Sequence, residues 1–324
     1  MDARARRGPA RCPGLGLAEL KVLVVNAGST SLKLHIVEGE EDSAPVETFV
    51  ECEAVGHRVV HGGAHLVEPV VIDDEVKAAV RELTPLAPLH NAPALAAIED
   101  AQQALPDVPH VAVFDTSFHR TMPEEATRYA VPEQWLEWGV RRYGFHGLSV
   151  EWVASQVQVP RLVVCHLGGG SSVTAVLDGR SVETTMGFSP LEGVPMTTRS
   201  GSIDPGALLY LIREHGLSAD EIDDALEHRS GLAALSATSG DVRELAGDSL
   251  ALSVYVHRVA AAEAATAAAL GGLDAIAFTG GIGEHSAVVR TRVCERLAFL
   301  GPFDVHVVEA REELVIARAV RAVV

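Results

Sequence analysis

One pattern occurs twice in the sequence: an apolar strand enters a turn of small and hydroxyl residues and leaves it as a second strand. The first copy is "VVNAGSTSLKL" at residues 24–34, and the second is "CHLGGGSSVTAVL" at residues 165–177. Each copy predicts two strands joined by a polar turn. The repetition predicts two α/β halves. Because no long Pro- or Ser-rich linker separates them, we expect the halves to share an interface, with any ligand in the cleft between them.

The hydrophobic periodicity around these two copies alternates between that of strands and that of helices. Strands are predicted at residues 22–25, 32–37, 110–115, 161–170 and 274–283, and from residues 172 and 181. Helices are predicted at residues 73–83, 92–105, 149–157, 204–215, 219–228, 250–271, 286–300 and 312–322. The Ala-rich run at 259–272 is expected to be a buried helix rather than a membrane span, because Glu263 interrupts it and Ala is only weakly apolar.

Composition narrows the classes of partner. The chain has 324 residues and a net charge of −18, which repels nucleic-acid phosphates and anionic lipid surfaces, so neither a nucleic-acid nor a membrane partner is expected. The four scattered cysteines share no CxxC spacing, which indicates neither a zinc site nor a disulfide framework and suits the cytoplasm. Residues 1–20 contain arginines but no apolar segment, and are predicted to form a disordered extension rather than a secretory signal.

The first polar turn has the composition of an anion-binding site. Small residues let a phosphate approach the backbone amides, Asn26, Ser29 and Ser31 add donors, and Lys33 adds a compact positive charge. An ordinary polar hairpin with a solvated lysine is the alternative interpretation. Two more Gly-rich segments, "HLGGGSS" at 166–172 and "FTGGIGEH" at 278–285, also follow apolar strands, and the latter leads into a helix N-terminus. Together the three favour a nucleotide phosphate cradle, although none matches the P-loop or GxGxxG pattern.

Two arginines and one histidine are candidates for the chemistry. Arg58 and Arg199 lie in segments dense in Gly, His and hydroxyl residues, where a guanidinium suits carboxylate or phosphate binding. The alternative is that each forms a buried salt bridge, for which Asp115 and Asp204 are available. His146 in "YGFHG" is flanked by glycines that leave it accessible. Other histidines have weaker claims: His61, His65, His90, His119 and His166.

The ordered motifs "VNAGSTSLK", "HRVVHGG", "PLAPLHN", "FDTSFH", "YGFHG", "HLGGGSS", "TRSGSIDPG", "FTGGIGEHS" and "EELVIA" resemble those of the acetate kinase family from Lys21 onward. The resemblance implies an α/β fold with two ribonuclease-H-like domains of the acetate and sugar kinase, Hsp70 and actin superfold, and a nucleotide in the interdomain cleft. It implies an N-terminal carboxylate and magnesium domain at 21–148 plus 311–324, and a C-terminal nucleotide-binding domain at 149–310. The expected reaction is ATP-dependent phosphorylation of acetate to acetyl phosphate, with Mg²⁺ or alternatively Mn²⁺.

The resemblance also assigns roles to positions of this chain. It implies a metal site at Asn26 and Glu312, a carboxylate-binding role for Arg58, and catalytic roles for Asp115, His146 and Arg199. An apolar pocket for the alkyl end of the substrate is implied at Val60, Leu89, Phe145 and Pro190. Nucleotide-binding positions are Lys33, His166, Leu167, Gly168, Gly169, Gly170, Asp241, Val242, Arg243, Gly281, Ile282, Gly283, Glu284 and His285.

Three positions depart from the family pattern, and the chain is shorter than usual. Gly169 and His285 stand where the family has asparagine, and Ser202 stands where it has aspartate. The missing residues fall mainly between 37 and 55, with a second loss between 201 and 312. Propionate or butyrate kinase, and a nucleotide-binding protein without kinase activity, are the alternative functions. A homodimer is a further family expectation.

Overall fold

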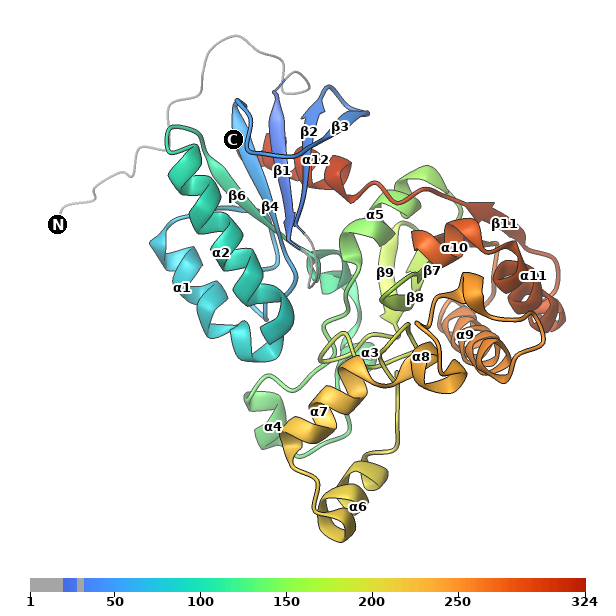
Figure 1. Cartoon of the computed structure of the whole chain (residues 1–324). Helices are drawn as coiled ribbons and strands as arrows, with labels where there is room; N and C mark the ends of the chain where they lie inside the picture. Colours follow the sequence, from blue (N-terminus) through green and yellow to red (C-terminus); the bar gives the residue numbers. More distant parts are fainter. Residues whose placement is uncertain (1–19, 28–31) are drawn as a thin grey trace.

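The computed structural model describes residues 20–27 and 32–324, so the predicted N-terminal extension, apart from Leu20, lies outside the described residues, as do Ser29 and Ser31. Two sheets with flanking helices form the structure (Figure 1). The strands are β1 (Val22–Ala27), β2 (Leu32–Glu38), β3 (Asp42–Val46), β4 (Ala54–Val59), β5 (Val70–Val71), β6 (His110–Phe114), β7 (Arg161–Leu167), β8 (Ser171–Leu177), β9 (Arg180–Thr184), β10 (Ala275–Thr279) and β11 (Asp304–Val307). The α-helices are α1 (Asp74–Glu82), α2 (Pro88–Ala104), α3 (Glu124–Thr127), α4 (Glu133–Glu137), α5 (Gly147–Gln156), α6 (Pro205–His215), α7 (Ala219–His228), α8 (Gly231–Ser236), α9 (Leu250–Ala269), α10 (Gly280–His285), α11 (Ala287–Arg296) and α12 (Glu312–Val323).

The two sheets repeat one topology. Sheet order is β3-β2-β1-β4-β6-β5 in the first half and β11-β10-β7-β8-β9 in the second. Each half contains an antiparallel hairpin, β1–β2 or β7–β8, and a parallel strand pairs with the other edge of its first strand. The prediction of two related α/β halves is therefore confirmed. It follows that the two hairpins occupy equivalent places in the two sheets.

The interface between the halves is apolar. One buried cluster combines residues of both sheets, such as Val24 and Val164, with residues of α5 and α12. Helix α12 lies against β1 and β4, and a Cβ added at Gly56 on β4 would meet the side chains of Ile316 and Val320 at 2.6 and 2.7 Å. Gly56 is thus required for the close approach of α12. From β11 the chain crosses from the second half to the first and enters α12 there (Figure 1).

Several short elements were not predicted. Strands β3 and β11 are edge strands with largely exposed residues, so neither shows a hydrophobic period. The segment at 278–285, predicted as a glycine turn before a helix, forms the short helix α10 directly after β10. Helix α2 begins at Pro88, four residues before its predicted start, because a proline is accommodated in the first helical turn.

None of the helices in the described residues is both long and apolar enough to cross a membrane. Cys52, Cys165 and Cys294 are free thiols, and Cys12 lies outside the described residues.

Candidate active site

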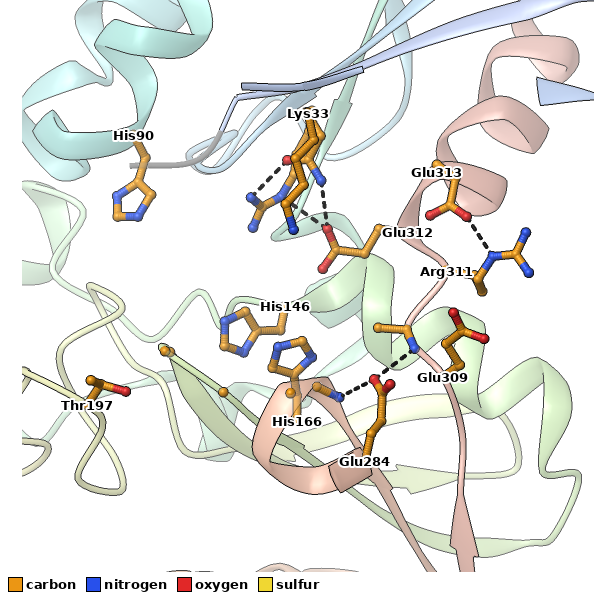
Figure 2. Close-up of a pocket in the computed structure, with 18 of the residues that line it drawn as sticks. Lys33, His90, His146, His166, Thr197, Glu284, Glu309, Arg311, Glu312 and Glu313 are labelled. Atoms are coloured by element: carbon orange, nitrogen blue, oxygen red, sulfur yellow. Dashed lines mark hydrogen bonds and ion pairs between the residues drawn. The ribbon is translucent and has the colours of Figure 1, made fainter. Parts of the chain in front are cut away.

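A cleft of about 1040 Å³ separates the two sheets and is lined by residues from both halves. Figure 2 shows the side chains of Lys33 on β2, His166 on β7 and Glu312 on α12 facing this space. Most of the predicted polar and glycine positions meet here although they are far apart in the sequence. The sequence-predicted residues in the lining are Asn26, Lys33, Arg58, His146, His166, Gly168, Gly169, Gly170, Arg199, Gly281, Glu284 and Glu312.

Arg58 is held at the cleft by a buried carboxylate. Its Nη2 donates to Asp115 Oδ2 at 2.8 Å, and the Asp115 side chain is only 1% exposed. Burial alone would lower the pKa of Arg58, but the carboxylates of Asp115 and Glu312 outweigh it and raise the pKa. The pKa of Asp115 is lowered, since its interaction with Arg58 outweighs the effect of burial. Both groups therefore stay ionised, and the salt bridge considered as an alternative for Arg58 exists within the cleft wall.

Asp115 also fixes the start of α5. Its carboxylate accepts the backbone N–H of His146 at 3.0 Å and that of Leu148 at 3.4 Å. His146 adopts a left-handed conformation with φ of 59°, an uncommon state for a residue with a side chain. Asp115 does not line the cleft. Its geometry is that of a residue that positions Arg58 and His146.

His146 and Arg199 converge on Gly170. A Cβ added at Gly170 would lie 3.1 Å from His146 Nε2 and 3.7 Å from Arg199 Nη1. The absence of a side chain at this position therefore leaves open a space that an imidazole and a guanidinium both face. By contrast, a Cβ at the neighbouring Gly169 would have nothing within 4 Å.

Two imidazole rings form the floor of this region. The centroids of His146 and His166 are 4.1 Å apart with an interplanar angle of 31°, and Figure 2 shows the two rings side by side. Burial, followed by the nearby His166, lowers the pKa of His146, and burial lowers that of His166. Both rings are therefore neutral near pH 7 and can donate one hydrogen bond each without adding charge.

The partner of Arg199 differs from the one considered in the sequence. Arg199 Nε donates to Glu227 Oε2 on α7 at 2.6 Å, whereas the side chain of Asp204 caps α6 by accepting from the Gly206 amide. Asp204 was thus the wrong candidate, because its Asp-Pro-Gly context makes it a helix cap. One edge of the Arg199 guanidinium is held by Glu227, while Nη1 remains directed to the cleft.

Asn26 and Glu312 meet at the other wall of the cleft. Asn26 Nδ2 donates to Glu312 Oε2 at 3.0 Å, and Glu312 begins α12. Both line the cleft with Lys33, whose backbone pairs with Asn26 across the β1–β2 hairpin. Figure 2 shows Lys33 and Glu312 near each other. Strand pairing and the return of α12 bring this carboxylate, amide and ammonium together.

The predicted nucleotide-binding positions divide into two groups. Glu284 lines the cleft and its Oε1 accepts the backbone N–H of Gly280 at 2.9 Å and of Ala310 at 3.1 Å, so it connects α10 to the segment before α12 (Figure 2). Arg243 forms an exposed ion pair with Asp241. The positions outside the lining are Leu167, Asp241, Val242, Arg243, Ile282, Gly283 and His285. Ser202, one of the departures, bonds to Gly193 and also lies outside it.

Among the described side chains, those of the predicted apolar pocket do not open to the cleft. Val60 and Phe145 belong to a buried cluster with Met186 and Met196, each at most 2% exposed, and neither lines the cleft. Pro190 is buried and also outside the lining. The side chain of Leu89 lies outside what the structure describes.

Some lining residues were missed or given little weight. His90 on α2 lines the cleft, and burial, then the charge of Arg199, lowers its pKa to about 4. Its position in "PLHN" was the available signal. The sequence contained no comparable signal for Glu227, because it lies in an amphipathic helix with other acidic residues. Arg311 also lines the cleft and pairs with Glu313 at 2.6 Å (Figure 2).

Comparison with known proteins agrees with this geometry. The sequence profile described as the acetokinase family matches residues 46–318. The chain belongs to the acetokinase family. Its relatives include the acetate kinase of Deinococcus radiodurans, 52% identical over 81% of this chain and 73% of the relative, and that of Protochlamydia amoebophila, 46% identical over 84% of this chain and 73% of the relative.

Solved structures of the acetokinase family share the fold. The propionate kinase of Francisella tularensis superposes with a TM-score of 0.86, 32% identity, and coverage of 94% of this chain and 100% of that one. The acetate kinase of Porphyromonas gingivalis gives a TM-score of 0.84 at 32% identity, covering 94% and 99%. The predicted family and fold class are confirmed, and the chain is an acetokinase-family kinase.

Proposed function

We propose that this protein is an acetate kinase that catalyses reversible transfer of a phosphoryl group between ATP and acetate, giving acetyl phosphate. The observation that carries the proposal is the convergence of Arg58, His146 and Arg199 on one cleft next to a glycine turn. A protein that only binds a nucleotide does not need two arginines, Arg58 and Arg199, in the cleft next to the glycine turn. The arrangement suits a reaction between two anions.

The chemistry needs positioning and charge stabilisation more than a base. The attacking oxygen of acetate is already anionic, so the main barrier is bringing it to a charged phosphoryl group. In the proposed arrangement Arg58 binds the carboxylate, and His146 and Arg199 donate to the transferred phosphoryl oxygens. Such preorganised donors act where charge develops, and the loss of one typically costs about 3 kcal/mol. Asp115, ionised and buried, is proposed to hold Arg58 and the backbone of His146.

The donor set at Asn26 and Glu312 fits Mg²⁺, or Mn²⁺ in its place. Mg²⁺ is usually bound by one or two carboxylates together with substrate phosphates and waters. Glu312 and Asn26 line the cleft, and Asn26 Oδ1, which accepts from Arg58 Nη1 at 3.3 Å, would exchange that donor for the ion. The described residues contain no group of three His, Cys, Asp or Glu that could bind a metal unaided. When bound with ATP, the ion would neutralise phosphate charge. Lys33 and the turn at Gly168, Gly169 and Gly170 are proposed to bind the nucleotide phosphates.

Formation of acetyl phosphate, measured as the hydroxamate, tests the proposal. We expect activity in the wild type and a loss of about 100-fold or more in Arg199→Ala. Because that change leaves Glu227 unpaired, the double variant Arg199→Ala/Glu227→Gln separates lost chemistry from lost folding. Arg229→Ala is the matched control, since Arg229 forms an exposed ion pair with Asp224 outside the cleft. Equal activity in wild type and Arg199→Ala would refute the mechanism, and an inactive wild type would favour a nucleotide-binding protein.

A propionate or butyrate kinase is the second candidate, and the similarity to the Francisella tularensis propionate kinase favours it. The closed cluster around Val60 and Phe145 supports the shorter acid, because little apolar surface is exposed to receive extra methylenes. One additional methylene in the acid changes the discrimination between two substrates by about 1–3 kcal/mol. Turnover on acetate, propionate and butyrate at equal concentration decides between them, and faster turnover of butyrate than acetate would exclude the first candidate.

We also propose the domain division and assembly implied by the resemblance. The packing of α12 on β1 and β4 supports an N-terminal domain of 21–148 plus 311–324 and a C-terminal domain of 149–310. Helix α6 supports a homodimer: it lies at one end of the molecule (Figure 1), has no buried residue, and exposes Leu209, Tyr210 and Ile212. A requirement for ATP and free thiols supports a cytoplasmic protein.

A further inference from the structure

Two buried serines contact the two cleft histidines in the same way. Ser172 Oγ on β8 lies 2.9 Å from His146 Nδ1, and Ser149 Oγ on α5 lies 2.8 Å from His166 Nδ1. Both serines have no exposed surface. Each pair joins the start of α5 to the hairpin β7–β8. Each pair also holds one ring at Nδ1, while Nε2 of His146 faces the space at Gly170 and Nε2 of His166 faces Gly280.

The direction of these hydrogen bonds follows from what the hydroxyls can reach. A buried hydroxyl that donates to no acceptor carries a desolvation penalty, so its hydrogen is directed to whatever acceptor is available. Among the described residues, the imidazole Nδ1 is the one hydrogen-bond partner of Ser172 Oγ, and the same is true of Ser149 Oγ. Each serine must therefore donate, and each Nδ1 must accept.

This direction determines the state of the opposite ring nitrogen. In a neutral imidazole one nitrogen is protonated and the other accepts, so an accepting Nδ1 places the proton on Nε2. Nε2 of His146 faces the space at Gly170 beside Arg199, and Nε2 of His166 faces Gly280. The reverse tautomer would direct a lone pair at the place where anionic phosphoryl oxygens are proposed to bind.

We infer that Ser172 and Ser149 are positioning residues that fix the tautomers of His146 and His166, so that each ring presents Nε2–H to the phosphate region. The catalytic role of the two N–H donors rests on the proposed function, whereas the assignment of the tautomers is independent of it. Burial keeps both rings neutral, because it lowers the pKa of each. The serines thus supply two donors to phosphoryl oxygens without placing two positive charges on rings 4.1 Å apart.

Nitrogen NMR of the full chain labelled with ¹⁵N-histidine tests the inference without any substrate. In the wild type near pH 7, we expect a pyridine-type Nδ1 and a pyrrole-type Nε2 for both residues, assigned from spectra of His146→Gln and His166→Gln. A protonated Nδ1 on either ring overturns the inference for that ring. The wild-type spectrum decides this, so the result does not depend on how well a serine variant folds.

Two serine variants extend the test to catalysis. In Ser172→Ala, we expect the His146 resonances to move toward a mixture of tautomers and kcat to fall about tenfold with a nearly unchanged KM for acetate. Ser172→Thr, which keeps the hydroxyl, is expected to restore the pyridine-type Nδ1. Ser155→Ala is the matched control on α5, because Ser155 Oγ donates to the backbone oxygen of Trp152 and contacts no histidine. Unchanged His146 resonances in Ser172→Ala would overturn the inference even in an active kinase, and an inactive wild type with the expected tautomers would refute only the proposed function.

Discussion

Replacing Gly170 by alanine should reduce turnover without loosening the fold. The added methyl would lie 3.1 Å from His146 Nε2, tighter than ordinary van der Waals contact, so the imidazole must move by a few tenths of an ångström. It would also narrow the space facing Arg199. Because a displacement of about 1 Å at a catalytic group can cost roughly 100-fold in rate, we expect kcat to fall about tenfold. The backbone at Gly170 is not left-handed, so alanine introduces no conformational strain there.

The neighbouring glycine provides the control. Gly169→Ala adds the same methyl to the same turn, but nothing lies within 4 Å of the new atom and the backbone is again not left-handed. We expect this variant to keep kcat within about threefold of the wild type, with any effect appearing in KM for ATP. Hydroxamate formation gives the rates, and thermal unfolding should show nearly equal midpoints for all three proteins. If both variants lose kcat equally, or Gly170→Ala loses none, the convergence of His146 and Arg199 on this space is not used in catalysis.

Two further predictions concern stability. Arg58→Ala leaves the carboxylate of Asp115 buried without its partner, so urea unfolding should show a loss of about 3 kcal/mol in unfolding free energy, and an unchanged midpoint would contradict the ion-pair assignment. Burial raises the pKa of Glu263 on α9 from 4.5 to about 8. Between these pH values the folded state holds a proton that the unfolded state releases. The free energy of unfolding is therefore highest below pH 4.5 and declines as the pH rises toward 8. Glu263→Gln keeps an acceptor for Cys165. It should raise the free energy of unfolding by about 3 kcal/mol at pH 7 and change it little at pH 4.5. Equal gains at both pH values would show that ionisation of Glu263 is not the cause.

The sequence was most informative where a local pattern determines the structure. Both polar hairpins and the long helices were predicted because their periodicity extends over many residues, as in α7, whose bounds at 219–228 match the prediction. Short elements such as β3 were missed because exposed edge residues show no period. The α2 start was placed late because a proline at a helix start interrupts the apolar pattern.

At the site, residue type predicted the members better than their contacts. Asp115 and Asp204 were named as available partners for Arg58 and Arg199, as the alternative to a binding role, and the structure places Arg58 2.8 Å from Asp115. Neither carboxylate pairs with Arg199, whose partner is Glu227. That pairing depends on how α7 returns to the cleft, and no local pattern encodes such long-range packing. Serine positions in "HLGGGSS" likewise gave no indication that Ser172 would contact His146.

The placement of α12 has a consequence for biosynthesis. The N-terminal sheet is translated early, yet the apolar face formed by residues such as Val22 and Val111 is covered by Ile316 and Val320, which are translated only after the strands of both sheets. Until then the nascent chain must carry an uncovered hydrophobic surface, a state prone to aggregation. The same late helix brings Glu312 to the cleft. Docking of α12 therefore covers the apolar surface and places Glu312 in the cleft in one step. A chain truncated before α12 would be prone to aggregation and would lack catalytic activity.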